Sequence, residues 1–302
     1  MTVPKKLANY EFYQNQKRWA FLVGGNRYDD SNFNPLKFCV NDVRALEQLL
    51  TQLGYTVTSF YDDHPDRRLP TIEAVEDALE VFTQTVGEND LAFVHFACHG
   101  DVYEKKEKDG TRTKHPVLIL QNTYRNSYAR RSLHVEELEE RLCGMGAKNV
   151  FLSLDACHVG VEIGRNASDP EFIDYICKDS KGFTLLAGST AQQKAQEWDA
   201  VEHGVYTYYL LKGLAGDAGH GKDASVVTAN SLQDYVLASL KKWRLANGFL
   251  PQEPTRKVEG TGDMMLACWE GIDRPASLIL TPNVSTSSRV ETRSQPTASL
   301  ST

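Results

Sequence analysis

Short apolar runs that alternate with helix-patterned segments are the feature that most constrains the fold of this chain. Five runs rich in Val, Phe and Leu, bounded by turn residues, predict buried strands at residues 19–25, 55–61, 91–97, 149–155 and 182–188. Three intervening segments carry apolar residues at helical spacing and stop at glycine, at residues 40–54, 71–87 and 134–146. Strands that alternate with helices pair in parallel through right-handed crossovers. We therefore expect an α/β fold with helices on both faces of a mostly parallel sheet.

The rest of the chain completes this plan and adds less regular segments. Helices are expected at about 204–215 and 230–246, and residues 263–268 are expected to supply a sixth strand. Residues 101–116 are almost wholly polar and suit an exposed loop. Residues 161–181 join two expected strands and are long enough to form a functional loop. Thr71, with an acidic residue close behind it, is the expected N-cap of its helix.

The composition excludes several classes of protein. No window approaches the roughly 18 consecutive apolar residues that a membrane span needs. The N-terminus lacks the apolar core of a secretory signal, so we expect a cytoplasmic location with no membrane partner. The six cysteines are scattered without paired spacing and should stay thiols in a reducing compartment. A net charge of −7 argues against nucleic acid as the main partner.

A histidine and a cysteine follow two of the expected strands. The segment LAFVHFACHGD runs from one strand into His99, and NVFLSLDACHVG runs from another into Cys157. Ligands of parallel α/β sheets bind in the crevice beyond the carboxyl ends of the strands, so both side chains should reach the same edge. There an imidazole can deprotonate a thiol and then protonate a leaving amine. The pattern therefore predicts a cysteine nucleophile with a histidine base.

With these motifs the chain resembles the caspase-like cysteine peptidases, in their metacaspase and bacterial branch. The strand ends HG and D-x-C-H-x-G are similar to the family's catalytic segments, and RWAFLVGGNRYDDSNFNPLKFCVNDVRALEQLL, GVYTYYLLKGLAGDA and VVTANSLQDYV to its first and later elements. The resemblance covers roughly residues 18–270 and implies a caspase-like helix–sheet–helix sandwich around a mostly parallel six-stranded sheet. It implies a peptidase domain at 18–271, between an N-terminal extension (1–17) and a disordered Ser/Thr-rich tail (272–302).

The same resemblance implies the catalytic roles. Cys157 would attack the scissile carbonyl to form a thioacyl-enzyme, while His99 activates the thiol and protonates the departing amine. The backbone N–H groups of Gly100 and Cys157 would hold the oxyanion. The family uses a dyad, so no third catalytic side chain and no required cofactor are expected.

The resemblance also implies a specificity pocket. It carries Asp42 and Asp155 over as the floor of the primary pocket, with Cys39 of the C-x-N-D element beside them. Two carboxylates in a confined pocket favour a guanidinium, which can bond bidentately, or an ammonium. We therefore expect protein or peptide substrates that are cleaved after Arg or Lys. The local sequence DACHV departs from the Q-A-C-[RQG]-G pattern of caspases, which recognise aspartate through basic residues.

Two kinds of regulation follow from the resemblance. Many metacaspases require calcium, bound by an acidic cluster after the histidine strand. Here that stretch mixes its carboxylates with four lysines, and arginines stand at 130–131, so we expect calcium to be possible but not required. Relatives are often precursors in cell-death or defence pathways. Cleavage at Arg165, Lys178 or Lys181, by the enzyme itself or by an upstream protease, would fit this, although each is otherwise an ordinary solvated basic residue.

Other interpretations stay open at this point. A cysteine such as Cys157 is, taken alone, more often a buried structural thiol, and Asp42 on a helix could be a solvated acid. His95, inside a strand, is interpreted as a core histidine. A zinc site from the nearby cysteines and histidines lacks paired C-x2-C spacing, and GDAGHGKD (216–223) lacks the Ser or Thr and the strand context of a phosphate loop. A catalytically silent scaffold is the main alternative to an enzyme, and a nucleotide-binding domain is a third.

Overall fold

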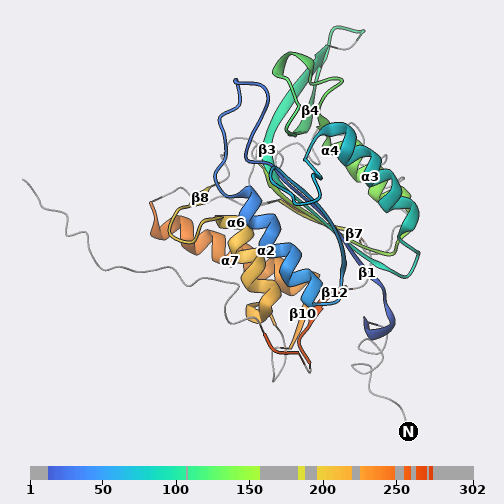
Figure 1. Ribbon diagram of the computed structural model, residues 1–302, viewed down its shortest axis with the longest axis vertical. Coiled ribbons are helices and arrows are strands. Elements are labelled where there is room, and N and C mark those ends of the chain that lie inside the picture. The colour runs from blue at the N-terminus through green and yellow to red at the C-terminus, as the bar shows by residue number, and fades with distance from the viewer. Residues whose placement is uncertain are drawn as a thin grey trace, which may run out of the picture.

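The computed structural model describes residues 13–106, 108–156, 183–187, 196–219, 225–248, 255–259, 263–270 and 272–274. In this described part of the chain the main sheet contains eight strands, six of which form a central row in the order β11-β7-β6-β3-β1-β2 (Figure 1). The bounds of these strands are β1 Arg18–Gly24, β2 Thr56–Tyr61, β3 Leu91–Lys106, β6 Asn149–Ala156, β7 Phe183–Ala187 and β11 Thr255–Glu259. All neighbours pair in parallel except β11, which runs antiparallel to β7. The expected mostly parallel sheet is confirmed, and the expected number of six strands applies to this central row only.

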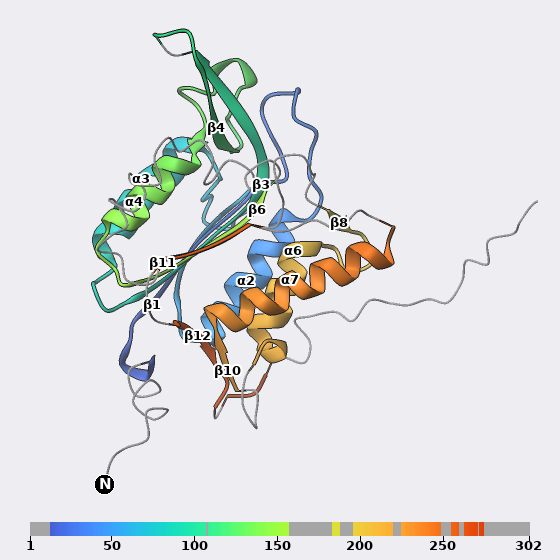
Figure 2. The ribbon, with the colours of Figure 1, turned by 180° about the vertical axis from the view of Figure 1, so that it is seen from behind.

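Helices cover both faces of the sheet, as Figures 1 and 2 show. Helices α2 (Cys39–Gln52), α6 (Val205–Lys212) and α7 (Ala229–Ala246) cover one face, and α3 (Ile72–Thr85) and α4 (Val135–Gly144) cover the other. Successive residues of a strand point to opposite faces. In β1, Leu22 belongs to the core under α2, whereas Phe21 and Val23 belong to the core under α3. Burial on both faces is why these strands appear in the sequence as continuous apolar runs.

The predicted helices all form, with ends displaced by only a few residues. Thr71 is the N-cap of α3, and its hydroxyl accepts a hydrogen bond from the Ala74 N–H at 3.4 Å, as expected. The helix expected at 204–215 is α6, which continues into a short π-helical turn, Gly213–Asp217. No helix among the described residues is long and apolar enough to cross a membrane.

The expected sixth strand was placed in the wrong segment. Residues 263–268 contain β12 (Met265–Cys268), which pairs with β10 (Val226–Thr228) in a separate two-stranded sheet. The sixth strand of the central sheet is β11, whose sequence TRKVE has a single strongly apolar residue. β11 is held to β7 by backbone hydrogen bonds, which form whatever the side chains are, so this strand needs no continuous apolar run. The apolar pattern therefore could not reveal it.

The polar stretch at 101–116 is exposed as expected, but it is not an irregular loop. Strand β3 continues to Lys106 and forms an antiparallel hairpin with β4 (Arg112–Ile119), and β4 also pairs with β5 (Leu133–His134). The hairpin projects beyond the two helix layers (Figures 1 and 2). Both of its faces meet solvent toward the tip, so the alternation that normally marks a strand is missing from the sequence.

The strand order places a crevice at one edge of the sheet. From β1 the chain passes to β2 on one side, and then to β3, β6 and β7 on the other. The direction of winding reverses between β1 and β3, and ligands of such sheets bind at the carboxyl ends next to this switch point. The carboxyl ends of β1, β3 and β6 lie at this edge.

Candidate active site

His99 lies at this edge, where β3 leaves the parallel sheet. Its backbone N–H donates to the Tyr28 hydroxyl at 2.9 Å, and the Tyr28 ring lies 4.9 Å from the imidazole. The imidazole Nε2 is 2.7 Å from the carbonyl oxygen of Asn34. Because a carbonyl oxygen only accepts, Nε2 carries the proton of this bond, and Nδ1 is the nitrogen that can act as a base. Two contacts from the loop after β1 thus fix both the position and the tautomer of His99.

Cys157 lies outside the described residues, as do Arg165, Lys178 and Lys181. The described part of β6 ends at Ala156, which is in register with Cys98 of β3. The residues that follow these two positions are Cys157 and His99. Gly100, whose N–H was expected to bind the oxyanion, follows His99 in β3 and is in register with Leu118.

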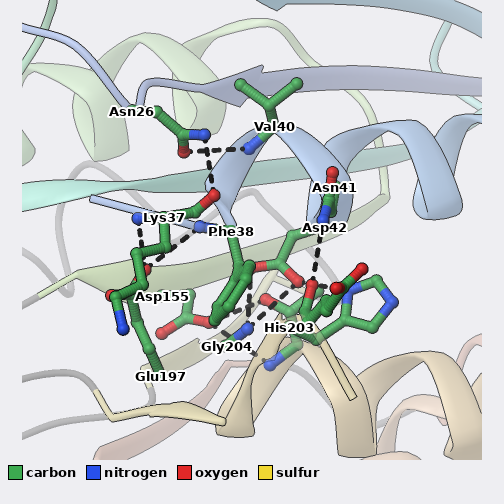
Figure 3. Close-up of polar contacts among 12 residues, drawn as sticks. Asn26, Lys37, Phe38, Val40, Asn41, Asp42, Asp155, Glu197, His203 and Gly204 are labelled. Atoms are coloured by element: carbon green, nitrogen blue, oxygen red, sulfur yellow. Dashed lines mark hydrogen bonds and ion pairs between the residues drawn. The ribbon is translucent and has the colours of Figure 1, made fainter. Parts of the chain in front are cut away.

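The two predicted pocket acids, Asp42 of α2 and Asp155 of β6, are brought together by the fold. They are only 1% and 6% exposed, which excludes the alternative that Asp42 is a solvated surface acid. Asp155 accepts hydrogen bonds at its Oδ2 from the Thr207 hydroxyl at 2.7 Å and from the Thr207 N–H at 3.3 Å. Asp42 accepts from His203 Nδ1 at 2.7 Å and from the Gly204 N–H at 3.2 Å (Figure 3).

These donors belong to the start of α6, and Gly204 is the N-cap of that helix. The partial positive charge of a helix N-terminus stabilises nearby carboxylates. A Cβ atom at Gly204 would lie 2.6 Å from Asp155 Oδ2 and 3.0 Å from Asp42 Oδ2. The two carboxylates therefore approach the same point of the backbone, and only glycine leaves them the space.

Burial shifts the protonation of this pair. Loss of solvent raises the pKa of Asp42 to about 6, although the hydrogen bond from His203 acts in the opposite direction and lowers it. Loss of solvent, together with the charge of Asp42, raises the pKa of Asp155 to about 7. Burial also raises the pKa of the Cys39 thiol well above its usual value, so Cys39 lines the site as an uncharged thiol. Buried acids with raised pKa values beside a catalytic candidate are typical of functional sites.

A pocket of about 330 Å3, counted to its open mouth, joins the histidine to the acids. The described residues that line it are Leu36, Cys39, Asp42, Cys98, His99, Asp155, Gln196, Glu197 and Gly204. The expected neighbours Cys39, Asp42 and Asp155 thus share one cavity with His99. This described part of the lining contains three carboxylates and no lysine or arginine.

Glu197 is the lining residue that the sequence did not reveal. It lies in β8 (Glu197–Trp198), which pairs with β9 (His203–Gly204). Its Oε1 accepts from the backbone N–H groups of Lys37 at 2.6 Å and Phe38 at 3.1 Å, at the start of α2. A glutamate in a polar segment between two apolar elements carries no sequence signal, because its place in the pocket depends on a two-residue strand. His203, in β9, was missed for the same reason, whereas Thr207 was missed because a threonine inside the predicted helix α6 carries no signal of its partner Asp155.

His95 is confirmed as a core histidine. Its side chain is fully buried and its Nδ1 lies 2.9 Å from the Ser153 hydroxyl. Burial lowers its pKa to about 3, so it stays neutral.

The described residues after the histidine strand do not fit a calcium ion. Asp101 accepts from the Tyr128 hydroxyl, Glu104 pairs with Arg112, and Asp109 accepts from Thr111. Nowhere in the described part of the chain do three His, Cys, Asp or Glu side chains gather as metal ligands. Calcium prefers six to eight converging oxygen ligands. We therefore derive no step through a metal.

The fold and this site define a caspase-type α/β protein, and comparison with known families agrees. The family model described as "Caspase domain" matches residues 17–241, so the chain belongs to the caspase domain family. Among curated proteins it is similar to Metacaspase-1 of Eremothecium gossypii, with 28% identity over 150 residues, 47% of this chain and 32% of the relative. Metacaspase-1 of Schizosaccharomyces pombe is 28% identical over 152 residues, 48% of this chain and 34% of the relative.

The chain thus matches about a third of the length of these relatives. Among solved structures, a protein from Geobacter sulfurreducens superposes with a TM-score of 0.53 and 18% identity, over 82% of this chain and 95% of that chain. At this identity the superposition supports the fold alone. The resemblance to the metacaspase branch that the motifs indicated is confirmed by the family match and the curated relatives.

Proposed function

We propose that this chain is a cysteine endopeptidase that cleaves after Arg or Lys, with Cys157 as nucleophile and His99 as base. The observation that carries the proposal is the single pocket that joins His99 to three carboxylates at the carboxyl edge of the sheet. Family membership supports a cysteine peptidase, and the acidic lining supports a cationic substrate side chain.

The mechanism follows from the tautomer of His99. Since Asn34 holds the proton on Nε2, Nδ1 can take the thiol proton from Cys157. The thiolate attacks the scissile carbonyl, and the N–H groups of Gly100 and Cys157 hold the oxyanion. The imidazolium then gives its proton to the departing amine, which leaves a thioester. His99 next deprotonates a water molecule that attacks the thioester, and Cys157 is released as the thiol.

The pocket acids would bind the substrate side chain before the cleaved bond. The shortest bonds that hold the two carboxylates, both 2.7 Å, are accepted by Asp42 Oδ1 from His203 and by Asp155 Oδ2 from Thr207. The opposite oxygens, of which Asp42 Oδ2 also shares the Gly204 N–H at 3.2 Å, would bind a guanidinium fork or an ammonium. A bound cation would also favour ionisation of this pair, which burial disfavours. If the only role of the two acids were to cap α6, that role would explain the oxygens that accept bonds near its start. It would leave the opposite oxygens unexplained.

The first experiment compares the wild type with Cys157→Ala on fluorogenic peptides that differ only in the residue before the bond. Turnover after Arg and Lys, absent in Cys157→Ala and weakened in Asp155→Asn, is the expected result. Turnover only after Asp would contradict the pocket assignment. If no peptide is cleaved, the assay is repeated after limited proteolysis, because Arg165, Lys178 and Lys181 are proposed processing sites of a precursor. If no peptide is cleaved after limited proteolysis either, the result would favour the catalytically silent scaffold.

A regulatory role remains part of the proposal. A precursor activated by an upstream protease, in a cell-death or defence pathway, is what the resemblance to metacaspases implies. Mass spectrometry of the cleaved chain would test it: new termini after the proposed sites would support the precursor, and an intact active chain would contradict it.

A further inference from the structure

A histidine that the proposed mechanism does not use lies against the floor of the pocket. His203 is 9% exposed, and its Nδ1 lies 2.7 Å from Asp42 Oδ1 (Figure 3). Because a carboxylate oxygen only accepts, Nδ1 carries the proton of this bond. The next residue, Gly204, shares its N–H between both oxygens of the same carboxylate at 3.2 Å. His203 is thus the only described side chain bonded to Asp42, and it binds the Oδ1 edge.

The backbone around this histidine is firmly held. In the β8–β9 pair His203 is in register with Trp198, whose ring packs edge-on against Tyr208 at 5.2 Å. The turn between the two strands is tied to α2, because the Asn41 side chain donates to the Glu202 carbonyl at 3.1 Å. The imidazole is therefore fixed relative to the helix that carries its carboxylate partner.

We propose that His203 is a positioning residue of the specificity pocket: its N–H orients the carboxylate of Asp42 so that Oδ2 faces a bound Arg or Lys side chain. This inference rests on the proposed function. The groups that face Asp42 explain why one donor matters. Asp155 of β6 and Glu197 of β8 add negative charge beside it, and among the described groups only His203 and the Gly204 N–H favour its ionised form. Without the imidazole, a buried carboxylate would keep a single shared backbone donor.

The test compares three substitutions of His203 in the full chain. An asparagine amide can occupy the place of Nδ1, a glutamine amide reaches further, and leucine offers no donor. With an Arg peptide, His203→Leu should raise KM about 10- to 100-fold, the loss of one hydrogen bond to an ionised group. Its kcat should change little, and the acid limb of its pH profile should move to higher pH. His203→Asn should restore most of the KM, and His203→Gln should not.

A double-mutant cycle separates positioning from a general structural role. In an Asp42→Asn background, His203→Leu should add little, because both changes remove the same interaction. Additive effects, or an unchanged KM in His203→Leu, would overturn the proposal. If the leucine variant does not fold, the comparison of His203→Asn with His203→Gln tests the proposal instead. Equal KM values in these two variants would overturn it.

A measurement that needs no turnover distinguishes this inference from the proposed function. The side-chain carboxyl carbon of Asp42 can be titrated by NMR in the wild type and the three variants. Its pKa should rise in His203→Leu and return toward the wild-type value in His203→Asn. If this shift is seen in a chain that never cleaves after Arg or Lys, the proposed function fails while the positioning of Asp42 stands. If there is no shift, the positioning proposal fails.

Discussion

Replacing Thr207 by valine tests the pocket with almost no change of shape. Thr207 is fully buried in α6, and its hydroxyl donates to Asp155 Oδ2 at 2.7 Å. Valine keeps the β-branch and the volume but leaves Asp155 with only the Thr207 N–H at 3.3 Å. A hydrogen bond to an ionised group contributes about 1.5–3 kcal/mol, and about 1.4 kcal/mol corresponds to one pKa unit. The pKa of Asp155, already about 7, should therefore rise by about one to two units in Thr207→Val.

The sign of the effect on activity follows directly. A raised carboxyl pKa lowers the ionised fraction at a given pH, and the proposed substrate side chain needs an ionised partner. At neutral pH, kcat/KM for an Arg peptide should fall by about 10- to 100-fold in Thr207→Val, and the loss should shrink as the pH rises. The acid limb of the kcat/KM profile should move upward by the same one to two units as the pKa, again at about 1.4 kcal/mol per unit.

The assay measures kcat/KM against pH for the wild type, Thr207→Val and Thr207→Ser. Serine keeps the hydroxyl and removes only a methyl group, so its acid limb should stay close to that of the wild type. Thermal unfolding of all three proteins controls for loss of fold. An unmoved acid limb in Thr207→Val would refute the reasoning, and so would an equal loss in Thr207→Ser, which would indicate packing rather than charge.

Three further predictions address the same site. Because the pKa of Asp155 is raised in the folded chain, its contribution to stability is present below the ordinary aspartate pKa and is lost as the pH rises toward about 7. The free energy of unfolding in urea should therefore fall over that pH interval in the wild type relative to Asp155→Asn. A rise would contradict the assignment. Gly204→Ala should lower both melting temperature and turnover of Arg peptides, since its Cβ would meet Asp155 Oδ2 at 2.6 Å; normal kinetics would show that the pocket can shift. Turnover should survive EGTA, and a loss that calcium reverses would show that a calcium site exists after all.

Much of the fold could be predicted because its signals are local. The five apolar strands and the amphipathic helices appear in the expected places, since burial on both faces of the sheet leaves a continuous apolar run for each strand. The exceptions lie where the sequence of a strand is mostly polar. The outer half of β3 and the edge strand β11 form through backbone pairing, so their polar sequences gave no periodic signal.

The site was predictable only in part, and for a different reason. His99 and Cys157 follow strand ends, and parallel strands bring their ends to one edge, so the sequence and general topology predict a common location, of which the structure describes only His99. The resemblance supplied Asp42 and Asp155, and the structure brings them together in one pocket. Glu197, His203 and Thr207 come from short elements whose position depends on packing against α2 and β6.

The amino-acid sequence by itself determined the layered α/β architecture and the edge of the sheet at which chemistry is expected. The reason is that the spacing of apolar residues along the chain shows which segments are buried strands and which are helices with one buried face. The tertiary structure decided the tautomer of His99, the raised pKa values of the pocket acids and the donors that anchor them. These properties depend on distances of about 3 Å between groups far apart in the chain and on the removal of water from between them.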